Sequence, residues 1–224
     1  MHGGFPSPNH GPRRDGHSPE LIVLHYTGMA TCAGARARLC DPVAEVSAHW
    51  LVDADGSVEQ LVDEGARAWH AGAGAWAGAG DVNSRSIGIE IQNPGDRPFP
   101  HPQMVALERL LAGVMARHGI PPQGVIAHSD MAPARKRDPG PRFDWRRLAL
   151  GGLSVWPGPG GNPQADFSGS AHRFGYPQAS GDAVLAAFRL RFRPWAAGPE
   201  DAVDRALADD LARRFPVDGG HRGA

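Results

Sequence analysis

The 224-residue chain lacks several features that mark whole classes of protein. No segment approaches the roughly 18 consecutive apolar residues that a membrane-spanning helix needs. Positive side chains number 23 and negative ones 24, so no basic excess predicts a nucleic-acid partner and no charge block predicts a membrane surface. The two cysteines, Cys32 and Cys40, are too few for a disulfide scaffold or a four-cysteine zinc module, and we expect both to be reduced core residues.

The first 20 residues also lack the apolar stretch of a secretory signal. We therefore expect a cytoplasmic protein, with the periplasm as the alternative if a leader has been removed.

Lysine is the scarcest charged residue, because only one of the 23 Lys and Arg side chains is a lysine, Lys136. A compact ammonium can act as a point charge or shift its pKa, which a guanidinium does not do readily. The single lysine is thus a candidate for a chemical role, and its survival by chance is the alternative.

Apolar residues make up 41 % of the chain, enough for a packed core. The continuous apolar run 21–24 predicts a strand that is buried on both faces. Residues 87–91 alternate, which predicts a strand with its isoleucines on one face and Gly88 and Glu90 on the other. A hairpin over 48–52 and 58–62, helices over 30–40 and 102–118, and a strand over 125–127 complete the pattern. This order predicts an α/β fold with a mixed central β-sheet flanked by helices.

Changes in composition divide the chain into four parts. We expect an N-terminal arm over 1–19, a catalytic domain over 20–150, a linker over 151–164 and a small C-terminal helical module over 165–224. Amphipathic helices are predicted over 183–192 and 202–215. Because so short a module cannot bury a robust core of its own, we expect it to dock on the first domain. The Gly- and Ala-rich residues 71–80 predict a flexible surface loop.

Two histidines, His25 and His128, each follow a short apolar strand, where side chains enter a cleft at the end of a sheet. Asp138 comes ten residues after His128. Two imidazoles and one carboxylate suffice for a catalytic zinc ion whose fourth position holds water. The same spacing also fits two polar strand-end histidines and an unrelated aspartate in a turn.

Glu90 and Lys136 can complete such a site. Glu90 lies in mid-strand on the face that Gly88 leaves bare, where it must be paired or line a polar cavity. In a zinc cleft it could take a proton from water and pass it to a leaving nitrogen, and a salt bridge with Arg85 is the structural alternative. Lys136 precedes Asp138 by two residues, so it could stabilise the oxyanion of a tetrahedral intermediate.

These residues fall in motifs that resemble the zinc-dependent N-acetylmuramoyl-L-alanine amidases, relatives of the peptidoglycan recognition proteins and phage T7 lysozyme. The motifs are Leu24-His25-Tyr26-Thr27, Ser47-Ala48-His49-Trp50, Trp69-His70-Ala71-Gly72, Ser86-Ile87-Gly88-Ile89-Glu90, Ala127-His128-Ser129-Asp130 and Lys136-Arg137-Asp138-Pro139-Gly140-Pro141. The resemblance implies Zn²⁺ on His25, His128 and Asp138, Glu90 as general base and acid, and Lys136 as the group that stabilises the transition state. It suggests substrate contacts for His49, Trp69, His70 and Asn93, with structural hydrogen bonding as the alternative for the two histidines and packing for Trp69.

The tail resembles the peptidoglycan-binding helical domain of the AmiD-type amidases, through Phe174-Gly175-Tyr176-Pro177 and Arg191-Phe192-Arg193-Pro194.

The resemblance of the catalytic domain to the amidase family implies hydrolysis of the amide between the lactyl group of (anhydro-)N-acetylmuramic acid and L-Ala of the stem peptide. We expect a monomer that binds peptidoglycan fragments or muropeptides, without nucleic acid or a transmembrane segment. A non-catalytic peptidoglycan-binding protein and a zinc hydrolase of other peptides are the alternatives.

Overall fold

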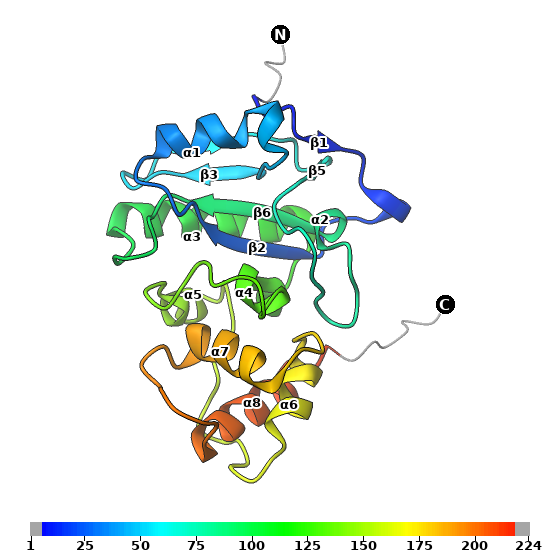
Figure 1. Cartoon of the computed structure of the whole chain (residues 1–224), viewed down its shortest axis with the longest axis vertical. Helices are drawn as coiled ribbons and strands as arrows, with labels where there is room; N and C mark the ends of the chain where they lie inside the picture. Colours follow the sequence, from blue (N-terminus) through cyan, green and yellow to red (C-terminus); the bar gives the residue numbers. More distant parts are fainter. Residues whose placement is uncertain (1–5, 218–224) are drawn as a thin grey trace.

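A five-stranded mixed sheet forms the centre of the protein in a computed structural model that describes residues 6–217 (Figure 1). The strands are β2 (Leu21–Tyr26), β3 (Trp50–Val52), β4 (Val58–Gln60), β6 (Ser86–Ile91) and β7 (Val125–Ala127), in the order β4-β3-β6-β2-β7. Strands β3, β6, β2 and β7 are parallel, and β4 pairs with β3 antiparallel through the predicted hairpin. The predicted mixed sheet flanked by helices is confirmed.

One face of the sheet packs on the long helix α3 (His101–His118). The helix has Pro102 in its first turn and ends at Gly119, whose φ of 67° suits a residue without a Cβ. Its apolar stripe meets the face of the sheet that carries the isoleucines of β6 and the even-numbered residues of β2. These core residues include Ile22, Leu24, Ile87, Ile89, Ile91, Met104, Leu107, Leu111 and Val114. The opposite face of β2 and β6 is thereby left for Leu21, Val23, His25, Gly88 and Glu90.

Helix α1 (Cys32–Leu39) packs on β3, on the face of the sheet that carries Glu90. It begins after Thr31, whose side chain accepts a hydrogen bond from the Gly34 N–H. Ala35 and Leu39 of this helix form a small core with Leu51 of β3. The two cysteines are free thiols, half-buried beside the same core.

The described part of the N-terminal arm is fastened to the domain rather than free. Strand β1 (His10–Gly11) pairs with β5 (Arg67–Ala68), and 3-10 turn η1 (Arg14–Gly16) follows. The Arg13 guanidinium donates to the carbonyl oxygens of Ser84, Ser86 and Glu64, which ties the arm to the segments around β6. Residues 1–5 of the predicted arm lie outside the described part.

Three helices make up the C-terminal module: α6 (Phe167–Phe174), α7 (Gly181–Phe192) and α8 (Ala202–Arg214). Figure 1 shows α4 (His128–Met131) and α5 (Trp145–Leu150) between these helices and the sheet. Apolar side chains of the module and the sheet form one continuous core, in which Phe174, Phe188 and Phe192 join Leu21, Val23 and Ile126. Helix α6 was not predicted. Residues 218–224 of the predicted module lie outside the described residues, and none of the helices from 6 to 217 could cross a membrane.

Residues 71–80 are anchored, unlike the flexible loop that their composition predicts. Trp76 is 1 % exposed and packs edge-on against Phe174 and Tyr176. The Arg85 guanidinium donates to the carbonyl oxygens of Trp76 and Ala79. The loop therefore links the sheet to the C-terminal module.

Candidate metal-dependent active site

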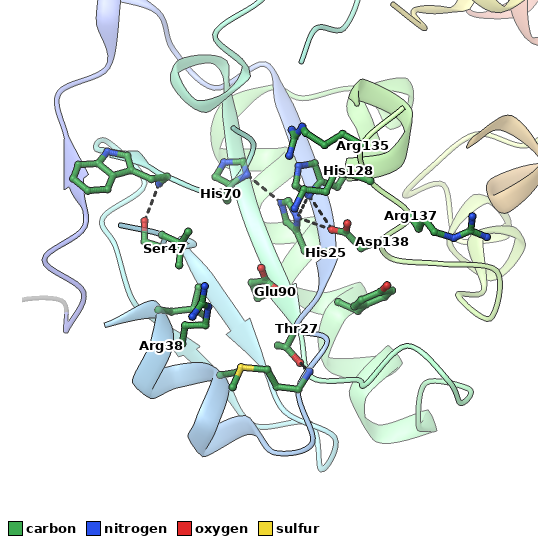
Figure 2. A pocket seen from close by; sticks show the side chains of 17 residues that line it. His25, Thr27, Arg38, Ser47, His70, Glu90, His128, Arg135, Arg137 and Asp138 are labelled. Carbon is green, nitrogen blue, oxygen red and sulfur yellow. Dashed lines mark hydrogen bonds and ion pairs between the residues drawn. The ribbon is translucent and has the colours of Figure 1, made fainter. Parts of the chain in front are cut away.

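The carboxyl ends of the parallel strands bring the predicted catalytic residues to one edge of the sheet. The parallel register places His25 of β2 directly beside Glu90 of β6, so both side chains project from the same face. His128 begins α4 immediately after β7, the other neighbour of β2. Together with Asp138 they line a cavity of about 450 Å³ (Figure 2).

His25, His128 and Asp138 direct one donor atom each toward a common point. The His25 Nδ1 lies 2.9 Å from the His128 Nδ1 and 2.9 Å from the Asp138 Oδ2, and the last two atoms are 3.0 Å apart. Tetrahedral zinc with bonds of about 2.0–2.1 Å needs donor atoms about 3.3 Å apart, so a few tenths of an ångström of expansion would suit the ion. The triangle therefore has the composition and nearly the size of a zinc-binding set.

The Nε2 atoms of His25 and His128 are the outer ring nitrogens, on the side away from the triangle, and their surroundings bear on the protonation of each ring. The His128 Nε2 lies 2.9 Å from the Ala71 carbonyl oxygen, which can only accept, so this nitrogen carries the proton. The pKa of His25 falls to about 4 because of burial and the nearby His128, so the His25 imidazole is neutral. In the neutral tautomer that the Ala71 carbonyl selects, the His128 Nδ1 is a lone pair that faces a carboxylate oxygen. Two such acceptors are held together best by a cation.

His70 continues the arrangement behind His25. Its Nδ1 lies 3.1 Å from the His25 Nε2, and its Nε2 lies 3.2 Å from the Ser86 Oγ, which donates to the Val82 carbonyl. If the His25 Nδ1 binds a metal, the His25 Nε2–H donates to the His70 Nδ1. The His70 Nε2–H then donates to the Ser86 Oγ, so the direction of each hydrogen bond from His25 to Val82 is fixed. The His70 ring also explains Gly88, because a Cβ there would lie 2.3 Å from the ring.

Glu90 is half-buried in the cavity wall, and Figure 2 shows it between the histidine cluster and Thr27. Its Oε2 is buried and has no hydrogen-bond partner among residues 6–217. Burial raises the pKa of Glu90 well above its usual value, the Asp138 carboxylate adds to the rise, and Lys136 opposes it. The alternative salt bridge with Arg85 is absent from this part of the chain, because the Arg85 Nε lies 2.5 Å from Glu20 instead.

The loop after α4 carries Lys136 to the cavity. The Ser129 N–H donates to the Asp138 carbonyl at 3.0 Å, and the Lys136 N–H donates to the Ala132 carbonyl at 2.9 Å, which folds the loop back on α4. Lys136 is half-buried and lines the cavity with Arg135 and Arg137, while Arg38 of α1 contributes a further positive charge. The three arginines were not predicted, although two of them flank Lys136 in the sequence.

The family to which the chain belongs follows from its sequence. Residues 15–141 match the family described as N-acetylmuramoyl-L-alanine amidase. The chain belongs to this amidase family. Its predicted resemblance to the family is therefore confirmed.

Relatives of this amidase extend the match beyond the family segment. N-acetylmuramoyl-L-alanine amidase AmiD of Escherichia coli is 35 % identical, over 89 % of this chain and 84 % of the relative. 1,6-anhydro-N-acetylmuramyl-L-alanine amidase AmpD of Enterobacter cloacae is 34 % identical, over 64 % of this chain and 86 % of the relative. The AmiD match thus spans more of the chain than the AmpD match.

Two similar solved structures have the same fold. A complex of E. coli AmiD with anhydro-N-acetylmuramic acid-L-Ala-D-gamma-Glu-L-Lys has a TM-score of 0.81 and 33 % identity, covering 90 % of this chain and 92 % of that chain. A complex of AmpDh3 from Pseudomonas aeruginosa with anhydromuramic pentapeptide has a TM-score of 0.79 and 29 % identity, covering 88 % and 92 %.

The four residues with predicted substrate contacts separate into two pairs in this amidase. Trp69 and His70 line the cavity. His49 is fully buried outside the cavity wall; its Nδ1 accepts the Gly88 N–H and its Nε2 lies 3.2 Å from the Ala66 carbonyl. Asn93 is also buried outside the wall, and its amide donates to the Arg97 carbonyl. Structural hydrogen bonds thus account for His49 and Asn93.

Proposed function

We propose that the chain is a zinc-dependent amidase that hydrolyses the bond between the lactyl carbonyl of (anhydro-)N-acetylmuramic acid and the nitrogen of L-Ala. The observation that carries this proposal is the donor triangle of His25, His128 and Asp138 beside the Glu90 Oε2, which has no hydrogen-bond partner in the described part of the chain. Water is consumed, and the products are the muramic acid carboxylate and a free stem peptide.

His25, His128 and Asp138 would hold the zinc ion. When bound there, zinc supplies a Lewis acid that polarises the scissile carbonyl and lowers the pKa of water. The chain contributes the orientation of its ligands, since His70 and the Ala71 carbonyl fix the outer nitrogens of both histidines.

Glu90 moves the proton. As a carboxylate it accepts a proton from the attacking water at Oε2, the oxygen that no other group of the described chain occupies. As a carboxylic acid it then donates this proton to the departing L-Ala nitrogen. The raised pKa suits both halves of the cycle, because a carboxyl group that titrates closer to neutrality donates and accepts more readily there.

Lys136 provides positive charge where the carbonyl oxygen becomes negative, as a second stabilising group beside the ligand set. A compact ammonium is enough for this role, and the paired N–H donors of a guanidinium are not needed. This is consistent with a lysine at this position in a chain that otherwise uses arginine.

The rest of the cavity suits a muropeptide. Arg38, Arg135 and Arg137 give it positive charge for the carboxylates of a stem peptide, and Trp69 offers an aromatic face to a sugar or peptide. Two of the similar structures hold anhydromuramyl peptides, which makes a soluble anhydro-muropeptide the substrate that we propose.

The surroundings of the enzyme are a further part of the proposal. All five proposed catalytic and metal-binding residues come from one chain, which supports action as a monomer, and light scattering after size exclusion tests it. The cytoplasm stays the predicted location, with the periplasm as the alternative, and cell fractionation distinguishes them.

The test is mass-spectrometric product analysis of the purified protein with an anhydro-muropeptide, with and without a zinc chelator. We expect a free stem peptide that begins at L-Ala, no product with chelator, and recovery when zinc is returned. Glu90→Gln loaded with zinc serves as the control for contaminating hydrolases. Binding without cleavage by the zinc-loaded chain would identify a peptidoglycan-binding protein instead, and cleavage elsewhere in the peptide would identify a different hydrolase.

A further inference from the structure

Asp130 connects the His128 turn to the C-terminal module. It is fully buried in α4, two residues after His128. Its Oδ2 accepts the Ala127 N–H at 2.9 Å, which closes the backbone turn around His128. The same carboxylate receives two side chains of the module: the Arg191 Nη1 lies 2.5 Å from Oδ2, and the Tyr176 hydroxyl donates to Oδ1 at 2.7 Å.

Arg191 is itself held through both terminal nitrogens of its guanidinium, while its buried Nε has no hydrogen-bond partner among residues 6–217. It is 2 % exposed, and its Nη2 donates to the Val125 carbonyl at 3.0 Å and to the Ser154 Oγ at 3.1 Å. Its guanidinium carbon lies 4.3 Å from the centre of the Trp145 ring. Because Val125 begins β7, this one side chain from α7 contacts both the strand before His128 and the turn after it.

His128 is linked to the module by a second route. Its Nε2–H donates to the Ala71 carbonyl, and Ala71 begins the anchored loop in which Trp76 packs between Phe174 and Tyr176. The Ala77 N–H also donates to the Gly175 carbonyl at 2.9 Å. Both the backbone and the ring of His128 are therefore positioned by groups that rest on the C-terminal helices.

We propose that Arg191 and Tyr176 are positioning residues for the metal ligand His128, which makes the C-terminal module a structural part of the metal site. This inference rests on the proposed function, since it assumes that the donor triangle binds zinc. Asp130 links the two module residues to His128. With Arg191 and Tyr176 in place, the charge of its carboxylate is balanced by the guanidinium, and the carboxylate is oriented to cap the turn. Without them, the cap loses its partners and the His128 Nδ1 loses its fixed direction.

The chain offers a matched control on the same helix. Arg189 also forms a buried ion pair, 2.5 Å from Asp204, but that pair joins α7 to α8 inside the module. Arg189→Met and Arg191→Met therefore each remove one buried guanidinium from α7 and leave one buried aspartate, although Asp204 keeps a second ion pair with Arg193 at 2.7 Å. Only Arg191→Met disturbs the turn that carries His128.

The experiment measures zinc affinity by competition with a chelating dye, and the visible spectrum of the cobalt(II)-substituted protein, at a temperature where each variant is folded. We expect Arg191→Met to weaken zinc binding by about tenfold, the lower end of the range for groups that orient metal ligands, and to shift the cobalt bands. Arg189→Met should lower thermal stability but leave both metal readouts at the wild-type value. Equal weakening in both variants, or in neither, would overturn the proposal.

Tyr176→Phe keeps the test decisive if Arg191→Met does not fold, because it removes one hydroxyl and keeps the packed ring. A smaller loss of zinc affinity with a shifted cobalt spectrum supports the positioning role, and wild-type values for both overturn it. Neither readout requires turnover. A wild-type chain that binds no zinc would refute the proposed metal dependence, and this inference with it, before any variant is compared.

Discussion

A methyl group added at Gly88 should disturb the proposed metal site indirectly, by displacing His70. In Gly88→Ala the new Cβ would meet the Cγ, Cδ2 and Nδ1 of His70 at 2.3, 2.5 and 2.6 Å. Favourable carbon contacts begin near 3.5 Å, so the imidazole must move by about 1 Å. The ring is hydrogen-bonded at both nitrogens, to His25 at 3.1 Å and Ser86 at 3.2 Å, and a shift of that size cannot preserve both bonds.

Two effects follow from this displacement. Overpacking should cost about 1–3 kcal/mol of the free energy of unfolding. For a chain of this size the loss lowers the melting temperature by about 3–10 °C. His25 would also lose the partner that fixes its outer nitrogen, which should weaken zinc binding by about 10- to 100-fold.

The assay is a zinc competition titration together with thermal unfolding of the zinc-free and zinc-loaded forms. Gly181→Ala is the control, because its Cβ would meet no atom within 4 Å at the start of α7. It should change stability by less than about 0.5 kcal/mol and leave zinc affinity unchanged. In the double variant Gly88→Ala/His70→Ala the clash is relieved, so stability should recover relative to Gly88→Ala while zinc binding stays weak. Wild-type zinc affinity in Gly88→Ala would refute the role given to His70.

The remaining predictions concern the proposed catalytic and metal-binding residues. Glu90→Gln should keep zinc yet lower kcat by about 10²- to 10⁴-fold in the product assay, and a near-wild-type rate would remove Glu90 as the base. The folded-state pKa of Glu90 is raised, so the zinc-free wild type loses stability as pH rises above the unfolded-state pKa of about 4.3. Zinc-free Glu90→Gln should therefore have a higher melting temperature than the zinc-free wild type at pH 7. The difference between the two melting temperatures should vanish below about pH 4. Lys136→Arg should lower kcat about 10²-fold at full zinc content, and an unimpaired variant would return the lysine to chance survival. His128→Ala should lose the metal, so that full zinc occupancy by elemental analysis would contradict the ligand assignment.

Local patterns predicted the parts of the fold that local interactions determine. The isoleucines of β6 alternate because one face packs on α3, and this alternation correctly indicated that Gly88 and Glu90 share the other face. His25 and His128 were placed at strand ends by the short apolar runs before them. The register that sets His25 beside Glu90 is a pairing between distant segments, so no single stretch of sequence contains it.

The elements that were not predicted depend on distant partners. Helix α6 is rich in small and polar residues, and its buried Phe167 and Phe174 have a core only when α7 and the loop around Trp76 are present. Composition likewise predicted a flexible loop over 71–80, which Trp76 and the distant Arg85 anchor. In a chain that uses arginine at nearly every basic position, nothing local distinguishes the buried Arg191 from an exposed arginine.

The lone lysine has a practical consequence for study of the protein. Because Lys136 lines the cavity and the sequence has no other lysine, an amine-reactive reagent has only that side chain and the α-amino group to modify. Reductive methylation with ¹³C-formaldehyde would therefore place a single side-chain NMR reporter at the cavity wall. Its chemical shift would follow metal loading and ligand binding directly, without mutation and without assignment of the remaining spectrum.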